Sequence, residues 1–145
     1  MNSIYHPPFA LPIVIWTLLF CCLLHAETAR AQAENVPGEF VSLNGIEMYY
    51  ETSGQGEPLI LLHGFNGSGQ AWASVIPEFA KHYRVIVPDL RGFGASPDGD
   101  QDASTMELFA QDVIAMMDRL EIERAVICGL SMGGYIAFEL WRSFP

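Results

Sequence analysis

The chain has 145 residues, with 7 lysines and arginines against 17 aspartates and glutamates, and a formal net charge of −10. Contacts to phosphate groups need clustered basic residues, so this charge excludes a nucleic-acid-binding protein and a polybasic membrane-surface protein. Hydrophobic residues make up 50% of the chain, which is too many for a disordered protein. The composition indicates an acidic globular protein with the length of one domain or of part of a larger one.

The first 33 residues have the pattern of a secretory signal peptide. Leu11–Leu24 is an apolar run without a charge, and as a helix it would rise only about 21 Å, less than the roughly 30 Å of a bilayer core. Small residues follow, and Ala29, Ala31 and Ala33 provide two A-x-A cleavage patterns. We therefore expect residues 1–33 to direct export to the periplasm or the medium, with no stable membrane association after cleavage. The segment before Leu11 lacks lysine and arginine, which leaves an uncleaved N-terminal anchor as the alternative.

Cysteine usage excludes a disulfide scaffold. Cys21 and Cys22 lie inside the leader, so that only Cys128 remains in residues 34–145, and one cysteine cannot form an internal disulfide. Cys128 lies in an apolar run, and we expect a small buried hydrophobic residue there, not a nucleophile.

Residues 34–145 alternate between strand and helix patterns. Phe40–Leu43, Asn44-Gly45 and Ile46–Tyr50 predict a β-hairpin, because Asn-Gly favours a turn with positive φ. The apolar runs are typical of strands buried on both faces, and helices are expected at apolar spacings of three and four residues. In chain order the remaining expected elements are a strand at Leu59–Leu62, a helix at Gln70–Ala80, a strand at Tyr83–Val87, a helix at Met106–Leu120, a strand at Ala125–Cys128 and a helix at Tyr135–Trp141.

These elements predict an α/β fold with a sheet that is antiparallel at its start and parallel afterwards, with flanking helices. For the helix at Met106–Leu120, Ser104 and Glu107 are expected to form a capping box that satisfies two backbone N–H groups at the helix start.

A nucleophile motif follows the last predicted strand. Gly129-Leu130-Ser131-Met132-Gly133 is G-x-S-x-G between a strand and a helix, the context in which a serine stands on a sharp turn above the sheet edge. Side chains at Gly129 or Gly133 would crowd such a turn, and Gly134 is expected to let the helix approach the sheet. The alternative is a glycine-rich turn whose serine only caps the helix.

Two further motifs extend the pattern. His63-Gly64-Phe65 directly follows the apolar strand, and Asp89–Ser96 fits D-x-R-G-x-G-x-S after the next strand. Together with the G-x-S-x-G motif, they resemble the α/β-hydrolase superfamily in order and spacing, over roughly residues 36–145. The resemblance implies Ser131 as the catalytic nucleophile and the backbone N–H groups of Phe65 and Met132 as the oxyanion hole. It also implies that His63 and Gly64 support the oxyanion loop, and that Gly129, Gly133 and Gly134 support the nucleophile turn.

Other polar and aromatic residues have structural interpretations. We expect Asp89 and Arg91 to brace their loop and Asp112 to lie in a packing helix. His82 is expected to be solvated at a helix end. Aromatic side chains at Trp72, Phe93 and Tyr135 fit either a pocket lining or the core.

The partners that Ser131 needs are missing from the sequence after it. In the superfamily an acidic residue and then a histidine follow the nucleophile in chain order, whereas residues 132–145 contain no aspartate and no histidine, and Glu139 is their only carboxylate. We therefore expect residues 34–145 to be the N-terminal half of an α/β-hydrolase domain, truncated after the nucleophile helix. Alone, this half is expected to have negligible activity.

Two hypotheses for function remain. In the first, the protein of which these residues are the N-terminal half is a serine hydrolase of the esterase, lactonase or C–C-hydrolase type. It acts on a small-molecule substrate through an acyl-enzyme at Ser131. A serine at this position argues against the dehalogenase and epoxide-hydrolase branches of the superfamily, which use aspartate. No cofactor, metal or nucleic acid is expected. The alternative is a non-catalytic remnant or an interaction module that uses the exposed edge of the strand at Ala125–Cys128.

Overall fold

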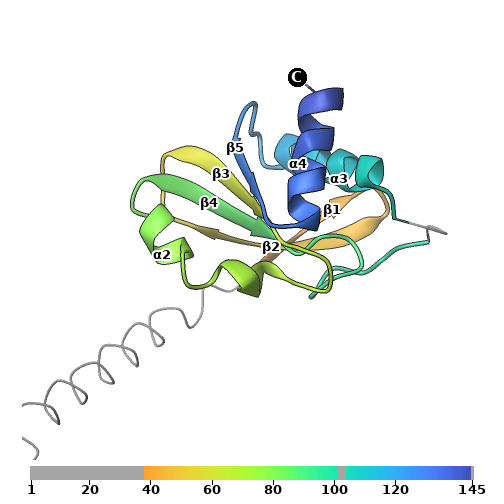
Figure 1. Ribbon diagram of the computed structural model, residues 1–145, viewed down its shortest axis with the longest axis horizontal. Coiled ribbons are helices and arrows are strands. Elements are labelled where there is room, and N and C mark those ends of the chain that lie inside the picture. Colours follow the sequence, from red (N-terminus) through yellow and green to blue (C-terminus); the bar gives the residue numbers. More distant parts are fainter. Residues whose placement is uncertain (1–37, 101–103, 145) are drawn as a thin grey trace, which may run out of the picture. The chain divides into compact units, whose positions relative to one another are not determined.

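The computed structural model of the protein describes residues 38–100 and 104–144 (Figure 1). The expected signal peptide, residues 1–33, lies outside these residues. The strands are β1 (Glu39–Leu43), β2 (Ile46–Ser53), β3 (Glu57–Leu62), β4 (Tyr83–Pro88) and β5 (Val126–Gly129). The helices are the 3₁₀-helix η1 (Gly69–Trp72), α2 (Ile76–Phe79), α3 (Met106–Arg119) and α4 (Met132–Ser143).

The strands form one mixed sheet in the order β1-β2-β4-β3-β5. β2 pairs antiparallel with both β1 and β4, whereas β3 pairs parallel with β4 and with β5. The expected change from antiparallel to parallel pairing is confirmed. Because β3, β4 and β5 run in the same direction, the loops that follow them meet at one edge of the sheet.

The hairpin between β1 and β2 has the expected turn. Asn44 and Gly45 have φ values of 41° and 79°, the left-handed conformation that Asn-Gly favours. The second strand of the hairpin continues to Ser53 and pairs with β4 through residues Tyr50–Ser53.

Alternate residues of the central strands pack on opposite faces of the sheet. On one face, Ile60, Leu62 and Ile86 join a core that α3 and α4 cover, and Figure 1 shows these two helices beside each other. On the other face, Leu59, Leu61, Val85 and Val87 pack against the side chains of η1 and α2. Burial on both faces explains why these strands are continuous apolar runs.

Two local predictions are wrong. The helix expected at Gln70–Ala80 is split into η1 and the short helix α2, which begins at Ile76 with Pro77 in its first turn. Pro77 has no N–H to continue a helix from the preceding turn, so the helix restarts there.

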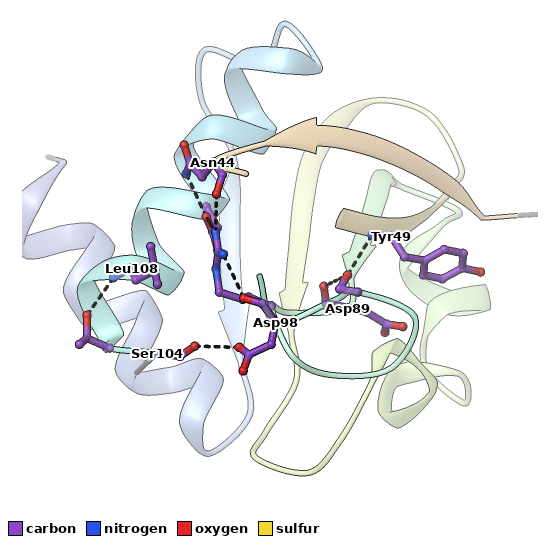
Figure 2. Close-up of polar contacts among 10 residues, drawn as sticks. Asn44, Tyr49, Asp89, Asp98, Ser104 and Leu108 are labelled. Carbon is purple, nitrogen blue, oxygen red and sulfur yellow. Dashed lines mark hydrogen bonds and ion pairs between the residues drawn. The ribbon is translucent and has the colours of Figure 1, made fainter. Parts of the chain in front are cut away.

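The capping box expected at Ser104 and Glu107 does not form. The N-cap of α3 is Thr105, whose hydroxyl accepts from the Leu108 N–H at 3.2 Å, and Ser104 donates to Asp98 instead (Figure 2).

At the other end of the sheet, β5 pairs with β3 and has no second neighbour among residues 38–100 and 104–144. Val126 of this strand is exposed, as are Phe138 and Trp141 of the adjacent α4. Within the described part of the chain, none of the helices has the length and apolar character needed to cross a membrane.

Candidate active site

Ser131 lies on a sharp turn between β5 and α4. Its φ of 52° and ψ of −112° are rare for a residue with a side chain, and such a conformation costs about 1–3 kcal/mol. The turn is held on both sides, since the Leu130 N–H donates to Leu62 O at 2.9 Å and the Gly133 N–H donates to Leu130 O at 2.9 Å. The Ser131 side chain makes no capping hydrogen bond to α4, and the residue is exposed. The helix-capping interpretation of this serine is therefore wrong.

Glycines make the turn possible by allowing backbone segments to touch. A Cβ on Gly129 would lie 2.2 Å from the Gly133 carbonyl carbon, and a Cβ on Gly133 would lie 2.2 Å from Leu62 O. Neither position can hold a side chain. A Cβ on Gly134 would make an ordinary contact, 3.7 Å from Gly129 O. The close approach of α4 to the sheet thus depends on Gly133, and the expectation that Gly134 provides it is wrong.

The loop after β3 lies directly against the serine turn. A Cβ on Gly64 would lie 3.3 Å from Leu130 O and 3.4 Å from the Ser131 Cβ. Phe65 is the next residue of this loop, and Met132 is the first residue of α4. Within residues 38–100 and 104–144, neither the Phe65 N–H nor the Met132 N–H has a hydrogen-bond acceptor. Two free N–H donors therefore come from the two segments that meet at Ser131.

His63 is fully buried and both of its ring nitrogens are engaged. Nε2 accepts from the Leu90 N–H at 2.9 Å, and Nδ1 lies 2.8 Å from Gly64 O. Because Leu90 can only donate, Nε2 carries no proton, and Nδ1 donates to the carbonyl. This neutral tautomer joins the loop after β3 to the loop after β4. His63 is thus in a supporting position and not free to take a proton from Ser131.

Asp89 makes a second connection between the same two loops. Its Oδ1 accepts from the Gly69 N–H at 2.7 Å and its Oδ2 accepts from the Ala95 N–H at 2.8 Å. The Ser96 hydroxyl donates to Asp89 O at 2.6 Å and accepts from the Tyr49 N–H at 2.9 Å (Figure 2). A Cβ on Gly94 would lie only 2.0 Å from Asp89 Oδ2. The D-x-R-G-x-G-x-S loop therefore folds around the aspartate carboxylate.

Arg91 and Asp112 form a buried ion pair behind this loop. The Arg91 Nε and Nη2 donate to the two carboxylate oxygens of Asp112 at 2.7 and 2.8 Å, and both side chains are almost completely buried. The hydrogen bonds from Arg91 to Asp112 are the main cause of the raised pKa of the arginine. Asn44 completes the network, because its Nδ2 donates to Asp112 and its carbonyl accepts from Arg91 (Figure 2). The pair fixes the β4 loop to α3 and to the β1–β2 turn.

Comparison with known proteins places this geometry in a family. The family model for the α/β-hydrolase fold matches residues 57–145. This chain belongs to the α/β-hydrolase fold family. It is 42% identical over 98 residues to the soluble epoxide hydrolase of Corynebacterium sp. (strain C12), an alignment that covers 66% of this chain and 33% of that protein. It is 38% identical over 111 residues to the 2-hydroxymuconate semialdehyde hydrolase of Pseudomonas sp. (strain CF600), with 74% of this chain and 39% of that protein covered.

Solved structures agree with this assignment. The chain superposes on Est816, described as an N-acyl homoserine lactone degrading enzyme, with a TM-score of 0.69 and 37% identity, covering 73% of this chain and 40% of that one. This α/β-hydrolase chain thus spans about a third to two fifths of the length of these relatives.

Of the aromatic side chains considered for a pocket lining in this α/β-hydrolase chain, Phe93 lies beside the candidate site. Phe93 packs edge-on against the rings of His63 and Phe65, with centroids 5.6 Å away in both cases. Trp72 packs in the cluster on the opposite sheet face, with its Nε1 buried and without a partner among the described residues, and Tyr135 is exposed on α4. His82 is exposed at the start of β4, at the sheet edge away from Ser131.

The remaining titratable candidates are occupied elsewhere. Glu139 accepts from Arg142 and Ser143, and the hydrogen bonds from Arg142 are the main cause of its lowered pKa. Cys128 is partly buried and packs in the cluster beneath η1 and α2. The part of the α/β-hydrolase chain described by the structure has no group of three histidine, cysteine or acidic residues that could hold a metal ion.

Sequence reasoning missed the partnership of Asp112 with Arg91 and Asn44. An acidic residue between buried positions of a helix is the signal that could have found it, because a buried carboxylate needs a cation or several donors.

Proposed function

We propose that this α/β-hydrolase is a serine hydrolase that acts on a small carboxylic ester, a lactone or a related carbonyl compound through an acyl-enzyme at Ser131. This proposal rests on an exposed serine on a strained turn, whose side chain does not cap α4, and on two nearby N–H donors that have no acceptor among the described residues. Backbone N–H groups in this arrangement stabilise the oxyanion that develops when a carbonyl is attacked. Membership of the α/β-hydrolase fold family supports the same reaction class.

In the proposed reaction, Ser131 Oγ forms a bond to the carbonyl carbon while its proton passes to a general base. The resulting oxyanion accepts from the N–H groups of Phe65 and Met132. The bond between the carbon and the leaving oxygen then breaks, and the base returns the proton to that oxygen. Water attacks the acyl-enzyme in the same way, which releases the acid and restores the serine.

The general base and the carboxylate that orients it are proposed to lie outside the described residues. Both nitrogens of His63 are engaged, and His82 lies at the wrong sheet edge. In the α/β-hydrolase family the acid and then the histidine follow the nucleophile in chain order. We propose that these two residues lie in a part of the protein that corresponds to the residues of the relatives that this chain does not cover.

Epoxide opening is the competing reaction, because one relative is named a soluble epoxide hydrolase. A carboxylate that opens an epoxide forms an ester, which water can hydrolyse at its carbonyl. A serine would form an ether, which has no carbonyl for water to attack, and the enzyme would stop after one turnover. Serine at position 131 therefore favours a carbonyl substrate over an epoxide.

The test is pre-steady-state hydrolysis of 4-nitrophenyl butyrate by the complete protein. We expect a burst of one 4-nitrophenolate per enzyme, followed by slower turnover. Ser131→Ala is expected to lower kcat by about 10⁴-fold or more, whereas Ser42→Ala, an exposed serine of β1, leaves it unchanged. Turnover that persists in Ser131→Ala, or turnover of an epoxide but of no ester, would contradict the proposal.

We also propose that residues 1–33 are an export signal, on the basis of their apolar run and the A-x-A patterns. N-terminal sequencing of the protein recovered from the periplasm or the medium is expected to show cleavage after Ala31 or Ala33. Recovery with Met1 intact in the membrane fraction would support the anchor instead.

A further inference from the structure

A hollow of about 290 Å³ lies beside the nucleophile turn, between the loops that follow β3 and β4 and the first turns of α3 and α4. Two of its lining residues are those with the free N–H groups, Phe65 and Met132. Its apolar lining consists of Phe65, Phe93, Met106, Phe109 and Met132. We propose that this hollow binds the acyl group of the substrate and selects an uncharged, apolar one. This proposal rests on the proposed function.

The position of the hollow assigns it to the acyl group and not to the leaving group. A leaving oxygen needs a proton from the general base, and no described histidine can serve Ser131. The described lining of the hollow, in contrast, includes Phe65 and Met132 beside the serine turn. The leaving group therefore departs toward the base, and the hollow, which shares Phe65 and Met132 with the oxyanion donors, receives the group that stays on Ser131.

The walls of the hollow favour apolar chains and rings. The Phe93 ring packs against the rings of both Phe65 and Phe109, with centroid separations of 5.6 and 6.4 Å. Methionine side chains adapt their shape to irregular apolar ligands, and Met106 and Met132 complete the surface. Each methylene buried here transfers apolar area out of water, which strengthens binding by about fourfold.

The charge in the hollow disfavours an anionic acyl group. Arg91 borders it, but four of the five N–H donors of the guanidinium are used by Asp112, Asp98 O and Asn44 O. Asp98 also borders the hollow, and its exposed carboxylate has only the Ser104 hydroxyl as a side-chain donor among the described residues. The remaining charge is therefore negative, and an acyl group that ends in a carboxylate would be repelled.

Kinetics of the complete protein with 4-nitrophenyl esters test the proposal, because the leaving group is constant. We expect kcat/KM to rise about fourfold per methylene from acetate through butyrate to hexanoate. The mono-4-nitrophenyl ester of glutarate, similar in length but anionic, is expected at least about tenfold below the hexanoate. Equal kcat/KM for the acetate and hexanoate esters, or for the hexanoate and glutarate esters, would overturn the proposal.

Substitutions assign the two selections to residues. Asp98→Asn is expected to raise the ratio of kcat/KM for the glutarate ester to kcat/KM for the hexanoate ester by about threefold. Phe65→Ala removes an exposed wall and is expected to lower the hexanoate-to-acetate ratio by about fivefold. Phe40→Ala, an exposed phenylalanine of β1, is the matched control and keeps the ratio. An unchanged glutarate-to-hexanoate ratio in Asp98→Asn, or an unchanged hexanoate-to-acetate ratio in Phe65→Ala, would refute the assignment.

Binding without turnover separates this proposal from the proposed function. In the complete Ser131→Ala protein labelled with ¹³C at the methionine methyl groups, hexanamide is expected to shift the signals of Met106 and Met132, and glutaramate is not. Shifts in a protein whose wild type turns over no ester would contradict the proposed function alone. Ester turnover without these shifts would overturn the acyl site alone.

Discussion

Replacing Asp112 by asparagine exchanges one carboxylate oxygen for an NH₂ group inside the most completely buried ion pair of the described residues. The carboxylate accepts from Arg91 Nε at 2.7 Å, from Arg91 Nη2 at 2.8 Å and from Asn44 Nδ2 at 2.9 Å. An amide keeps one accepting oxygen but turns an NH₂ group toward a donor. The loss of one charge-assisted hydrogen bond costs about 1.5–3 kcal/mol. The guanidinium that remains without a counter-charge raises the total to about 3–5 kcal/mol.

The assay is equilibrium unfolding of the complete protein in urea, followed by tryptophan fluorescence. We expect a lower midpoint for Asp112→Asn with an unchanged m-value, because the same surface is exposed on unfolding. Asp118→Asn removes an exposed carboxylate of the same helix and is expected to change the free energy of unfolding by at most about 0.5 kcal/mol.

A double variant separates the loss of charge from the loss of packing. Arg91→Met combined with Asp112→Leu removes both charges and fills similar volume, and we expect it to be more stable than Asp112→Asn alone, since replacement of a buried pair by apolar residues is often neutral. A loss below about 1 kcal/mol for Asp112→Asn, or a double variant no more stable than the single one, would refute this reasoning.

Three further predictions concern the loops, the sheet and the serine turn. Asp89→Asn loosens the oxyanion loop and is expected to lower kcat about tenfold with little change in KM in ester hydrolysis assays; a rise in KM alone would contradict this. Burial and the hydrogen bond to Glu39 raise the pKa of Tyr50 above 10.0. The tyrosine therefore stabilises the fold below pH 10, and this contribution is lost as the pH rises through the pKa of the folded state. Tyr50→Phe is expected to reduce the fall in the free energy of unfolding between pH 9 and 11. Gly133→Ala is expected to prevent folding while Gly134→Ala is tolerated, which circular dichroism of both variants tests; equal behaviour would be inconsistent with the contacts of the turn.

The elements that the sequence predicts best are those whose pattern reflects burial on both faces of a sheet. Leu59–Leu62 is an unbroken apolar run, and it lies between β4 and β5 with helices on both sides. The hairpin was predictable from Asn44-Gly45, because only a few residue pairs accept that turn. Such features depend on residues that are neighbours along the chain, so the sequence alone is enough to predict them.

The errors occur where a neighbour in space decides the structure. Ser104 and Thr105 are both good caps, and Asp98, six residues earlier in the chain, accepts from Ser104 and leaves the cap to Thr105. Pro77 was present in the sequence, but the apolar spacing around it suggested one continuous helix. Asp112 pairs with Arg91 from another loop, and although its position among buried residues of a helix signals that it needs a partner, no local pattern indicates which residue that partner is.

Covalent labelling of Ser131 tests the central claim most directly. The complete protein is incubated with a fluorophosphonate, digested and analysed by mass spectrometry, with the Ser131→Ala variant treated in parallel. We expect one phosphonyl group on the peptide that contains Ser131, loss of ester hydrolysis in proportion to labelling, and no label in the variant. An ester-hydrolysing protein that carries no label, or carries it on another residue, would contradict the account.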